Sequence, residues 1–208
     1  MSERLGILGA GKLGTTVARL AVDAGRDVLI ADERTGPMIE LIVSTVAAGA
    51  RFVGVDEMLA SSDIVLLAIP YSRVSELDPA KLAHAIVIDA TNPWIESDGA
   101  SPPESPLRSH PGIRLVRSLN HIAYEELISY AQPAGAPFRT AVAVASNDID
   151  ARKRVAALVD GLGFDPVELD MRSAWLLEVN GPFFGRRLSQ SEMTALVSAS
   201  QRAERLTW

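Results

Sequence analysis

The sequence predicts an α/β protein of the Rossmann type, in which a doubly wound, mostly parallel sheet is extended by a small C-terminal α/β portion. The first observation is an apolar run, Leu5–Leu8, that leads into the glycine turn Gly9-Ala10-Gly11-Lys12-Leu13-Gly14 and then into a helix-like segment. The second is another apolar run, Val28–Ala31, that ends at Asp32. The third is that strand-like and helix-like segments keep alternating along the rest of the chain. This order of elements indicates a dinucleotide-binding unit.

Each position of the glycine turn has a specific physical role in such a unit. Gly9 permits the tight turn out of the first strand, and Gly14 lets the following helix lie close to the sheet. Gly11 has no side chain, so a diphosphate can approach the free amide groups at the helix N-terminus. Asp32 is placed to accept hydrogen bonds from the adenosine ribose hydroxyls. The alternative is a glycine-rich turn in another kind of α/β protein.

The composition favours an enzyme-like domain and excludes several function classes. The 208 residues are 48% hydrophobic and 22% charged, which is ample for a packed core. A net charge of −6 gives no basic footprint for nucleic acid. There is no cysteine, and the three histidines show no metal-ligand spacing, so no metal is expected. The first strand begins almost at Met1 and no apolar run is long enough to span a membrane, so we expect a cytoplasmic protein without a membrane partner.

The remaining elements follow from hydrophobic periodicity. Strands are expected at Arg51–Val53, Asp63–Ile69, Ala85–Ala90, Ile113–Leu119, Phe138–Ala145 and Phe164–Leu169. Helices are expected at Thr15–Ala24, Thr35–Ala48, from a capping Asp56 to Leu59, at Ala123–Tyr130 and Asp150–Leu162, and from the capping box Ser189–Glu192 to Leu206. The stretch from Ile95 to Gly112, with its four prolines, is interpreted as an exposed connection. We place the dinucleotide-binding domain at residues 1–122 and the C-terminal extension at residues 123–208.

Ligands of doubly wound sheets bind beyond the carboxyl ends of the strands. In this chain those ends are Gly9–Gly11, Ala31–Arg34, Ala68-Ile69-Pro70-Tyr71, Thr91-Asn92-Pro93 and Leu119-Asn120-His121. We expect these five loops to form the active site. The residues expected to bind the cofactor are Gly9, Ala10, Gly11, Lys12, Leu13, Gly14, Asp32, Arg34, Ala68, Ile69, Pro70, Tyr71, Asn92, Pro93 and Asn120.

Several stretches resemble the NADPH-dependent reductases of coenzyme F-420, a deazaflavin. The cytosolic domain of the STEAP metalloreductases shares much of the same pattern. The matching stretches are Gly9–Gly14, Leu66–Pro70, Val87–Pro93, Leu115–Asn120, Val144–Asp148 and Leu162–Val167. They are individually weak and collectively fairly specific, and they cover nearly the whole chain.

The resemblance implies hydride transfer between a nicotinamide and a second flat redox ring, with coenzyme F-420 as the co-substrate. Such a transfer needs little acid–base help, because the cofactors carry the chemistry while the protein supplies alignment and excludes water. Asn92 and Asn120 would then be positioning residues beside the nicotinamide. No catalytic residue is certain, and the candidates are His121, Asn120 and Asn92.

One departure from the family concerns the choice between NAD and NADP. In the deazaflavin reductases a polar-basic pair, usually Ser-Arg, grips the adenosine 2′-phosphate after the second strand. This chain has Asp32-Glu33 there, with Arg34 next. Asp32 should repel the phosphate and favour NAD, whereas Arg34 could neutralise it. Both cofactors stay open.

Some residues have a structural and a functional interpretation. His121 is either a general acid near the second ring or an ordinary hydrogen-bonded loop histidine. Tyr71 either lines the nicotinamide ribose or is a turn residue after Pro70. Trp94 either packs on the second substrate at the cleft rim or belongs to the core.

The segment Asn180–Gly185, with adjacent Phe183 and Phe184, is interpreted first as a helix stop followed by a hydrophobic anchor. The alternative is an aromatic loop that covers a planar cofactor. Phe183-Phe184 and the C-terminal helix, with Met193, Leu196 and Val197 on one side, could supply the surface of a homodimer, which is the expected state.

Three other functions remain alternatives. One is a non-catalytic protein that senses NAD(P), because no convincing acid–base residue is visible. Another is a flavin or ferric reductase. The third, ranked lower, is a dehydrogenase or imine reductase of a small substrate, because many of these build their substrate site from a long helical C-terminal domain.

Overall fold

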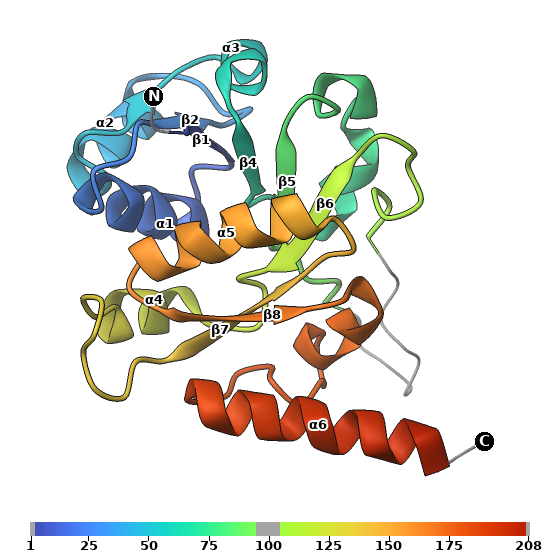
Figure 1. Ribbon diagram of the computed structural model, residues 1–208. Coiled ribbons are helices and arrows are strands. Elements are labelled where there is room, and N and C mark those ends of the chain that lie inside the picture. Colours follow the sequence, from blue (N-terminus) through green and yellow to red (C-terminus); the bar gives the residue numbers. More distant parts are fainter. Residues whose placement is uncertain (1–2, 95–104, 207–208) are drawn as a thin grey trace.

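A single eight-stranded sheet runs through the computed structural model, which describes residues 3–94 and 105–206. Its order is β3-β2-β1-β4-β5-β6-β7-β8, and all neighbours are parallel except β6 and β7, which are antiparallel (Figure 1). The strands are β1 Leu5–Leu8, β2 Val28–Ala31, β3 Arg51–Phe52, β4 Ile64–Leu67, β5 Ile86–Asp89, β6 Arg114–Ser118, β7 Ala141–Ala145 and β8 Asp165–Leu169. The predicted Rossmann-type, mostly parallel α/β fold is therefore confirmed.

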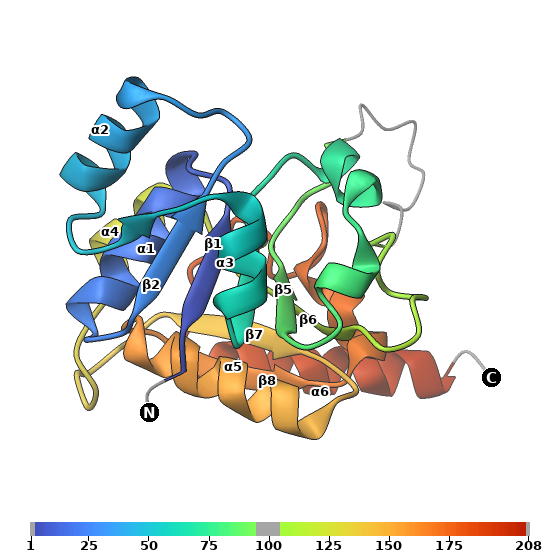
Figure 2. The ribbon, with the colours of Figure 1, turned by 90° about the horizontal axis from the view of Figure 1, so that it is seen from above.

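Helices cover both faces of this sheet (Figures 1 and 2). They are α1 Lys12–Asp23, α2 Pro37–Val46, α3 Val55–Ser61, α4 Tyr124–Tyr130, α5 Ile149–Gly161 and α6 Gln190–Leu206, with the short 3-10 helices η1 Tyr71–Glu76, η2 Pro79–Lys81 and η3 Met171–Leu177. One core cluster contains buried residues of α1, α2, α4 and α5, and the other contains those of α3, η1, η3 and α6.

The central strands form because they are apolar on both sides. Every residue of β1, β2, β4 and β5 is buried, as expected for parallel strands with helices on both faces. The two core clusters thus meet at the sheet, whose carboxyl edge stays free for loops.

The C-terminal extension joins the same sheet. Ser118 of β6 pairs with Val144 of β7, and Ala145 of β7 pairs with Leu169 of β8. The division at residue 122 stays a prediction. Because β6 and β7 are antiparallel, the start of β7 lies beside the loop that follows β6, which brings the C-terminal residues to the predicted active-site edge.

Most helix predictions are confirmed, with small shifts at the ends. The capping box of α6 is present: the Ser189 N–H donates to Glu192 Oε2 at 2.8 Å, and the Glu192 N–H donates to Ser189 Oγ at 3.3 Å. The capping role of Asp56 was wrong, because α3 begins one residue earlier and its N-cap is Gly54.

Two predictions about irregular segments need correction. Leu107 is only 2% exposed and belongs to the core, so residues 105–112 are not simply an exposed connection. Residues 95–104 lie outside the described residues. The three 3-10 helices were not predicted, because their short runs lack a sustained helical period.

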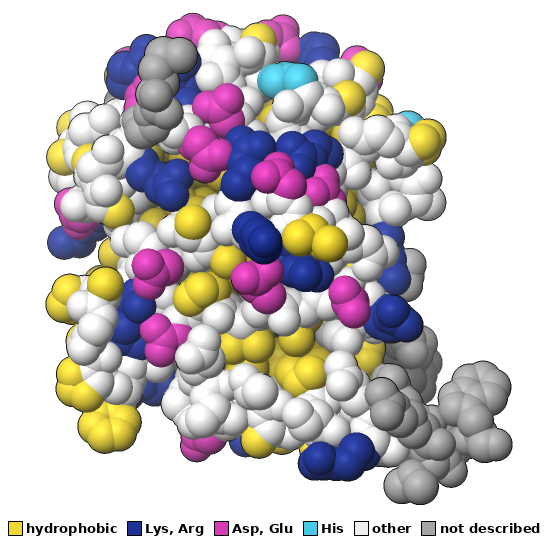
Figure 3. Space-filling view, viewed as in Figure 1, with side chains coloured by type: hydrophobic (Ala, Val, Ile, Leu, Met, Phe, Trp, Pro, Cys, Tyr) yellow, Lys and Arg dark blue, Asp and Glu magenta, His cyan; other side chains and the backbone are white. Residues whose placement is uncertain are grey.

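The predicted dimer surface is largely used within the chain itself. Phe183 is completely buried, and Met193 of α6 is buried against the core formed with β7 and β8. Figure 3 shows acidic and basic side chains interspersed over the face that carries α5. They form ion pairs such as Arg114 with Asp148 and Arg152 with Glu168. No helix among the described residues is both long and apolar enough to cross a bilayer.

Candidate functional site

The glycine turn after β1 has the geometry of a diphosphate cradle. Gly9 has φ +112°, and a Cβ there would lie 2.3 Å from the Ala68 carbonyl oxygen. A Cβ at Gly14 would lie 1.9 Å from the Gly9 carbonyl oxygen. A Cβ at Gly11 would meet nothing within 4 Å, although Gly11 is the N-cap of α1 and carries no side-chain cap. Gly9 and Gly14 are therefore required by packing, whereas Gly11 leaves the helix amides open to a ligand.

Asp32 lies directly behind this turn. Its Oδ2 accepts the Ala10 N–H at 2.8 Å, and its two oxygens accept the Arg34 guanidinium at 2.8 and 2.9 Å. Burial raises the pKa of Asp32, but hydrogen bonds from Arg34 and Ala10 outweigh it and lower the pKa to about 2. Asp32 is therefore charged at every physiological pH.

Beside Asp32 lies a pocket of about 380 Å³, hereafter the adenosine pocket. It is lined by Leu8, Gly9, Gly11, Asp32, Glu33, Arg34, Ala68, Ile69, Pro70, Arg73 and Leu77. Arg73 of η1 donates to both carboxylate oxygens of Glu33, at 2.7 and 2.6 Å. Sequence reasoning missed Arg73, because η1 was not predicted and nothing placed it beside Glu33.

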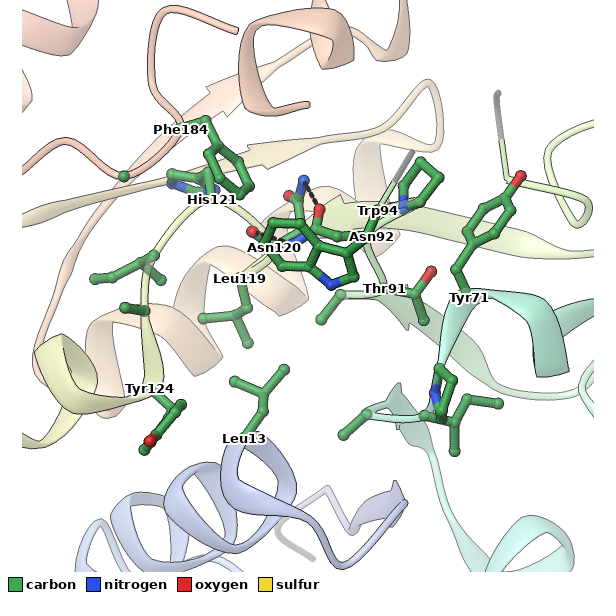
Figure 4. A pocket seen from close by; sticks show the side chains of 18 of the residues that line it. Leu13, Tyr71, Thr91, Asn92, Trp94, Leu119, Asn120, His121, Tyr124 and Phe184 are labelled. Carbon is green, nitrogen blue, oxygen red and sulfur yellow. Dashed lines mark hydrogen bonds between the residues drawn. The ribbon is translucent and has the colours of Figure 1, made fainter. Parts of the chain in front are cut away.

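A larger cleft of about 820 Å³ continues from the same wall (Figure 4). It is lined by Leu13, Ala68, Ile69, Pro70, Tyr71, Ser72, Ala90, Thr91, Asn92, Pro93, Trp94, Leu119, Asn120, His121, Ile122, Ala123, Tyr124, Glu125, Phe184 and Gly185. Ala68, Ile69 and Pro70 thus line both cavities, which adjoin at these three residues.

Most of the expected cofactor residues are brought together here. Three of them line neither cavity: Ala10, Lys12 and Gly14. Ala10 holds Asp32 through its N–H, and Lys12 lies over the Tyr124 ring, 5.0 Å from its centroid. Their predicted part in binding the cofactor stays a prediction.

Asn92 and Asn120 hold each other at the floor of the cleft. Asn92 Nδ2 donates to the Asn120 carbonyl oxygen at 2.7 Å, and Asn120 Nδ2 donates to Asn92 Oδ1 at 3.3 Å (Figure 4). Asn120 Nδ2 also donates to the Leu177 carbonyl oxygen at 2.7 Å. These bonds hold both side chains in place, and their positioning role beside a nicotinamide stays a prediction.

His121 is only 2% exposed, and its Nε2 accepts the Ala143 N–H at 3.2 Å. Burial, with a smaller contribution from the charge of Arg117, lowers the pKa of His121 to about 3. The imidazole is therefore neutral near pH 7. This favours the hydrogen-bonded loop histidine over the general acid.

A buried ion cluster anchors the C-terminal segment that closes the cleft. Arg117 donates to both carboxylate oxygens of Glu178, at 2.8 and 2.7 Å, and to Asp89 Oδ1 at 3.2 Å. The Gly185 N–H donates to the His121 carbonyl oxygen at 2.9 Å. Together with the Asn120–Leu177 bond, these contacts fix residues 177–185 to the end of β6.

That segment supplies one aromatic wall of the cleft. Phe184 meets Trp94 edge-on, with ring centroids 5.8 Å apart. Trp94 is 76% exposed, so the core-packing interpretation was wrong. Phe183 is the buried anchor of the first interpretation of this segment. Phe184 lines the cleft, as the alternative interpretation of an aromatic loop requires.

The comparisons with known proteins agree with this geometry. Residues 4–93, which contain β1 to β5, match the family described as NADP oxidoreductase, coenzyme F420-dependent. Residues 4–93 are therefore similar to members of that family. The stretch that matches the F420-dependent family includes the glycine turn, Asp32 and the wall shared by the two cavities.

Beyond the F420-dependent family model, a curated relative is a glycerol-3-phosphate dehydrogenase [NAD(P)+] from Geobacter metallireducens, 27% identical over 98% of this chain and 48% of the relative. The chain thus spans about half the length of this relative. Both matches are to NAD(P)-dependent oxidoreductases.

Similar solved structures include a hypothetical protein from Sinorhizobium meliloti, with a TM-score of 0.71, 23% identity, and coverage of 91% of this chain and 96% of that one. A protein proposed to be an F420-dependent NADP-reductase, from Arthrobacter sp. FB24, has a TM-score of 0.67, 23% identity, and coverage of 84% and 88%. An imine reductase from Myxococcus stipitatus in complex with NAD+ has a TM-score of 0.61, 14% identity, and coverage of 100% and 64%. At these identities the likeness shows the fold.

Proposed function

We propose that this protein transfers a hydride between NAD(P)H and a flat aromatic acceptor, either a deazaflavin such as coenzyme F-420 or a flavin. The observation that carries the proposal is the pair of adjoining cavities, an adenosine pocket with charged side chains and a larger apolar cleft, that share the lining residues Ala68–Pro70. This arrangement accommodates a dinucleotide whose nicotinamide end lies beside a second ring.

The residues present fit the dinucleotide. Gly11 leaves open space in front of the N-terminus of α1, where backbone amides favour a diphosphate. Asp32 and its neighbours surround the adenosine pocket, and Asn92, Pro93 and Tyr71 line the cleft at the nicotinamide end. When bound, the nicotinamide supplies the hydride, which carries two electrons and one proton. The acceptor's remaining proton comes from water.

The larger cleft suits a flat, mainly apolar acceptor. Its volume of about 820 Å³ lies within the range of small-molecule sites, about 300–1,000 Å³. Aromatic rings from separate segments line it, namely Tyr71, Trp94, Tyr124 and Phe184. Such walls align a ring by stacking and exclude water, which is the protein's main contribution to carbon-to-carbon hydride transfer.

A small carbonyl or imine substrate is less well supported. Reducing such a substrate requires a proton donor beside the reacting atom. His121 has a pKa of about 3, and burial followed by the charge of Asp89 raises the pKa of Tyr71 above its usual range. Neither group is poised near neutral pH.

The proposal is tested by an acceptor screen. Purified protein is mixed with NADH or NADPH and coenzyme F-420, a free flavin or a ferric chelate, and nicotinamide oxidation is followed by absorbance. We expect turnover with the deazaflavin or the flavin. Turnover with ferric chelate alone would indicate a metal reductase. Binding of NAD(P)H without oxidation by any acceptor would favour the sensing protein.

Aromatic variants locate the acceptor. Trp94→Ala and Phe184→Ala should each raise the KM for the acceptor by about tenfold and leave NAD(P)H affinity within twofold. Phe138→Ala is the matched control, because Phe138 is exposed and lines neither cavity. An unchanged acceptor KM in both cleft variants would contradict this placement.

Two further expectations belong to the proposal. One is a cytoplasmic location, and the other is a homodimer. Light scattering at monomer mass would refute the homodimer.

A further inference from the structure

Two ion pairs lie at the adenosine pocket, and neither was predicted from the sequence. The first joins Asp32 and Arg34, which are neighbours in sequence. The second joins Glu33 after β2 to Arg73 of η1, forty residues away, with both glutamate oxygens within 2.7 Å of Nη2. Arg73 also donates from Nε to Glu76 Oε2 at 2.7 Å.

These pairs leave the pocket without a spare positive charge. Two guanidinium groups face the three carboxylates of Asp32, Glu33 and Glu76, so the cluster carries a formal net charge of −1. Asp32 cannot neutralise this net negative charge by taking up a proton, since its pKa is about 2. A ribose 2′-phosphate would bring in a further charge of about −1.5 to −2.

A ribose with a free 2′-hydroxyl meets no such barrier. The Arg34 side chain is 66% exposed, and exposed ion pairs are weak, so a ribose diol can take its place on Asp32. The Ala10 N–H bond would still hold the carboxylate in position. Glu33 and Arg73 can remain paired throughout.

We infer that the adenosine pocket selects NAD(H) over NADP(H), and that Glu33 is a specificity-determining residue because it occupies Arg73 and repels a 2′-phosphate. This inference rests on the proposed function and names its cofactor. It sets this chain apart from the family that residues 4–93 match, whose description names NADP.

The experiment compares the affinities of NADH and NADPH for the full chain by calorimetry. The wild-type protein should bind NADH about tenfold more tightly or better. Glu33→Gln should tighten NADPH binding about tenfold and leave NADH within twofold, because Arg73 becomes free to meet the phosphate. Adding Arg73→Gln to that variant should remove the gain. Glu168→Gln is the matched control, since Glu168 is also ion-paired and exposed but lies on β8.

A second measurement does not need the nicotinamide half. Adenosine 5′-monophosphate should bind more tightly than adenosine 2′,5′-bisphosphate, and the difference should shrink as salt rises, because salt screens repulsion. If an arginine clamp held the 2′-phosphate, salt would weaken the bisphosphate more.

The outcomes separate this inference from the proposed function. NADPH binding tighter than NADH, or an unchanged ratio in Glu33→Gln, overturns the selectivity and leaves hydride transfer standing. Binding of neither dinucleotide overturns both.

Discussion

The adenosine pocket and the acceptor cleft share a wall but differ in what lines them. The pocket of about 380 Å³ contains the charged side chains of Asp32, Glu33, Arg34 and Arg73. The cleft of about 820 Å³ is lined mainly by apolar and aromatic side chains, and Glu125 is its acidic residue. Charge can discriminate between ligands that differ by a phosphate, whereas flat apolar walls align rings and tolerate variation. In the proposed function, recognition of the cofactor is therefore separate from alignment of the two reacting rings.

The largest expected effect comes from removing the ion cluster behind the cleft. Arg117→Met leaves the carboxylates of Asp89 and Glu178 without their common partner, which should lower the free energy of unfolding by about 3–5 kcal/mol. Chemical denaturation measures it. Arg114→Met is the control, because its ion pairs are more exposed and should contribute about 1 kcal/mol or less. Equal losses in the two variants would contradict the role of the buried cluster.

A single added methyl group should weaken binding at the adenosine pocket without affecting the cleft. Gly11→Ala adds a methyl group where nothing lies within 4 Å, so the fold should keep its Tm while dinucleotide affinity falls about a hundredfold. Calorimetric titration and thermal melting check both parts. Gly54→Ala, also at a helix N-cap with open space, should change neither. Undiminished affinity in Gly11→Ala would place the diphosphate elsewhere.

The burial of His121 beside the cleft predicts that the stability of the fold depends on pH. Folding lowers the pKa of His121 to about 3 from about 6.5, so the unfolded chain takes up a proton first as pH falls. His121 therefore contributes full stability above pH ~6.5, and by pH 4.5 about 2–3 kcal/mol of it should be lost. Denaturation of the wild type and His121→Gln across this range measures the difference in slope. Parallel curves would show that His121 titrates normally in the folded state.

The smallest expected effect is a change in the relative affinities of NADH and NADPH when Asp32 is replaced. Asp32→Ser removes the acceptor of the ribose hydroxyls and one negative charge, so NADH affinity should fall and NADPH affinity should rise, each by about threefold to tenfold. Titrations with both dinucleotides test this. An unchanged NADPH affinity would mean that Glu33 alone supplies the repulsion.

The sequence predicted the first half of the fold better than the second. The runs Leu5–Leu8 and Val28–Ala31 form strands with those same bounds. They could be predicted because buried parallel strands are continuous apolar runs and the glycine turn marks the end of the first one. The antiparallel pairing of β6 and β7 has no such signal, since it depends on contacts between distant residues. The 3-10 helix η1 was missed because its six residues lack a sustained helical period, and the position of Arg73 was missed with it.

The candidate site shows the same division. The glycine turn, Asp32 and the loops after β4, β5 and β6 could be placed from the rule that ligands bind at the carboxyl ends of strands. The burial of His121 could not, because it depends on β7 lying alongside: the Ala143 N–H occupies its Nε2. Phe184 was visible as a motif, but its place in the cleft depends on anchoring through Arg117 and Asn120.

The hydrogen bonds that attach residues 177–185 to the end of β6 have a consequence for how such enzymes diversify. In the proposed function, residues 177–185 form a short strap that contributes Phe184 to the acceptor site, while most residues expected to hold the dinucleotide follow β1, β2, β4 and β5. Exchanging the strap would retune which molecule is reduced and leave the source of electrons untouched. Directed evolution toward a new acceptor should therefore begin with residues 179–184, with the three tethers kept.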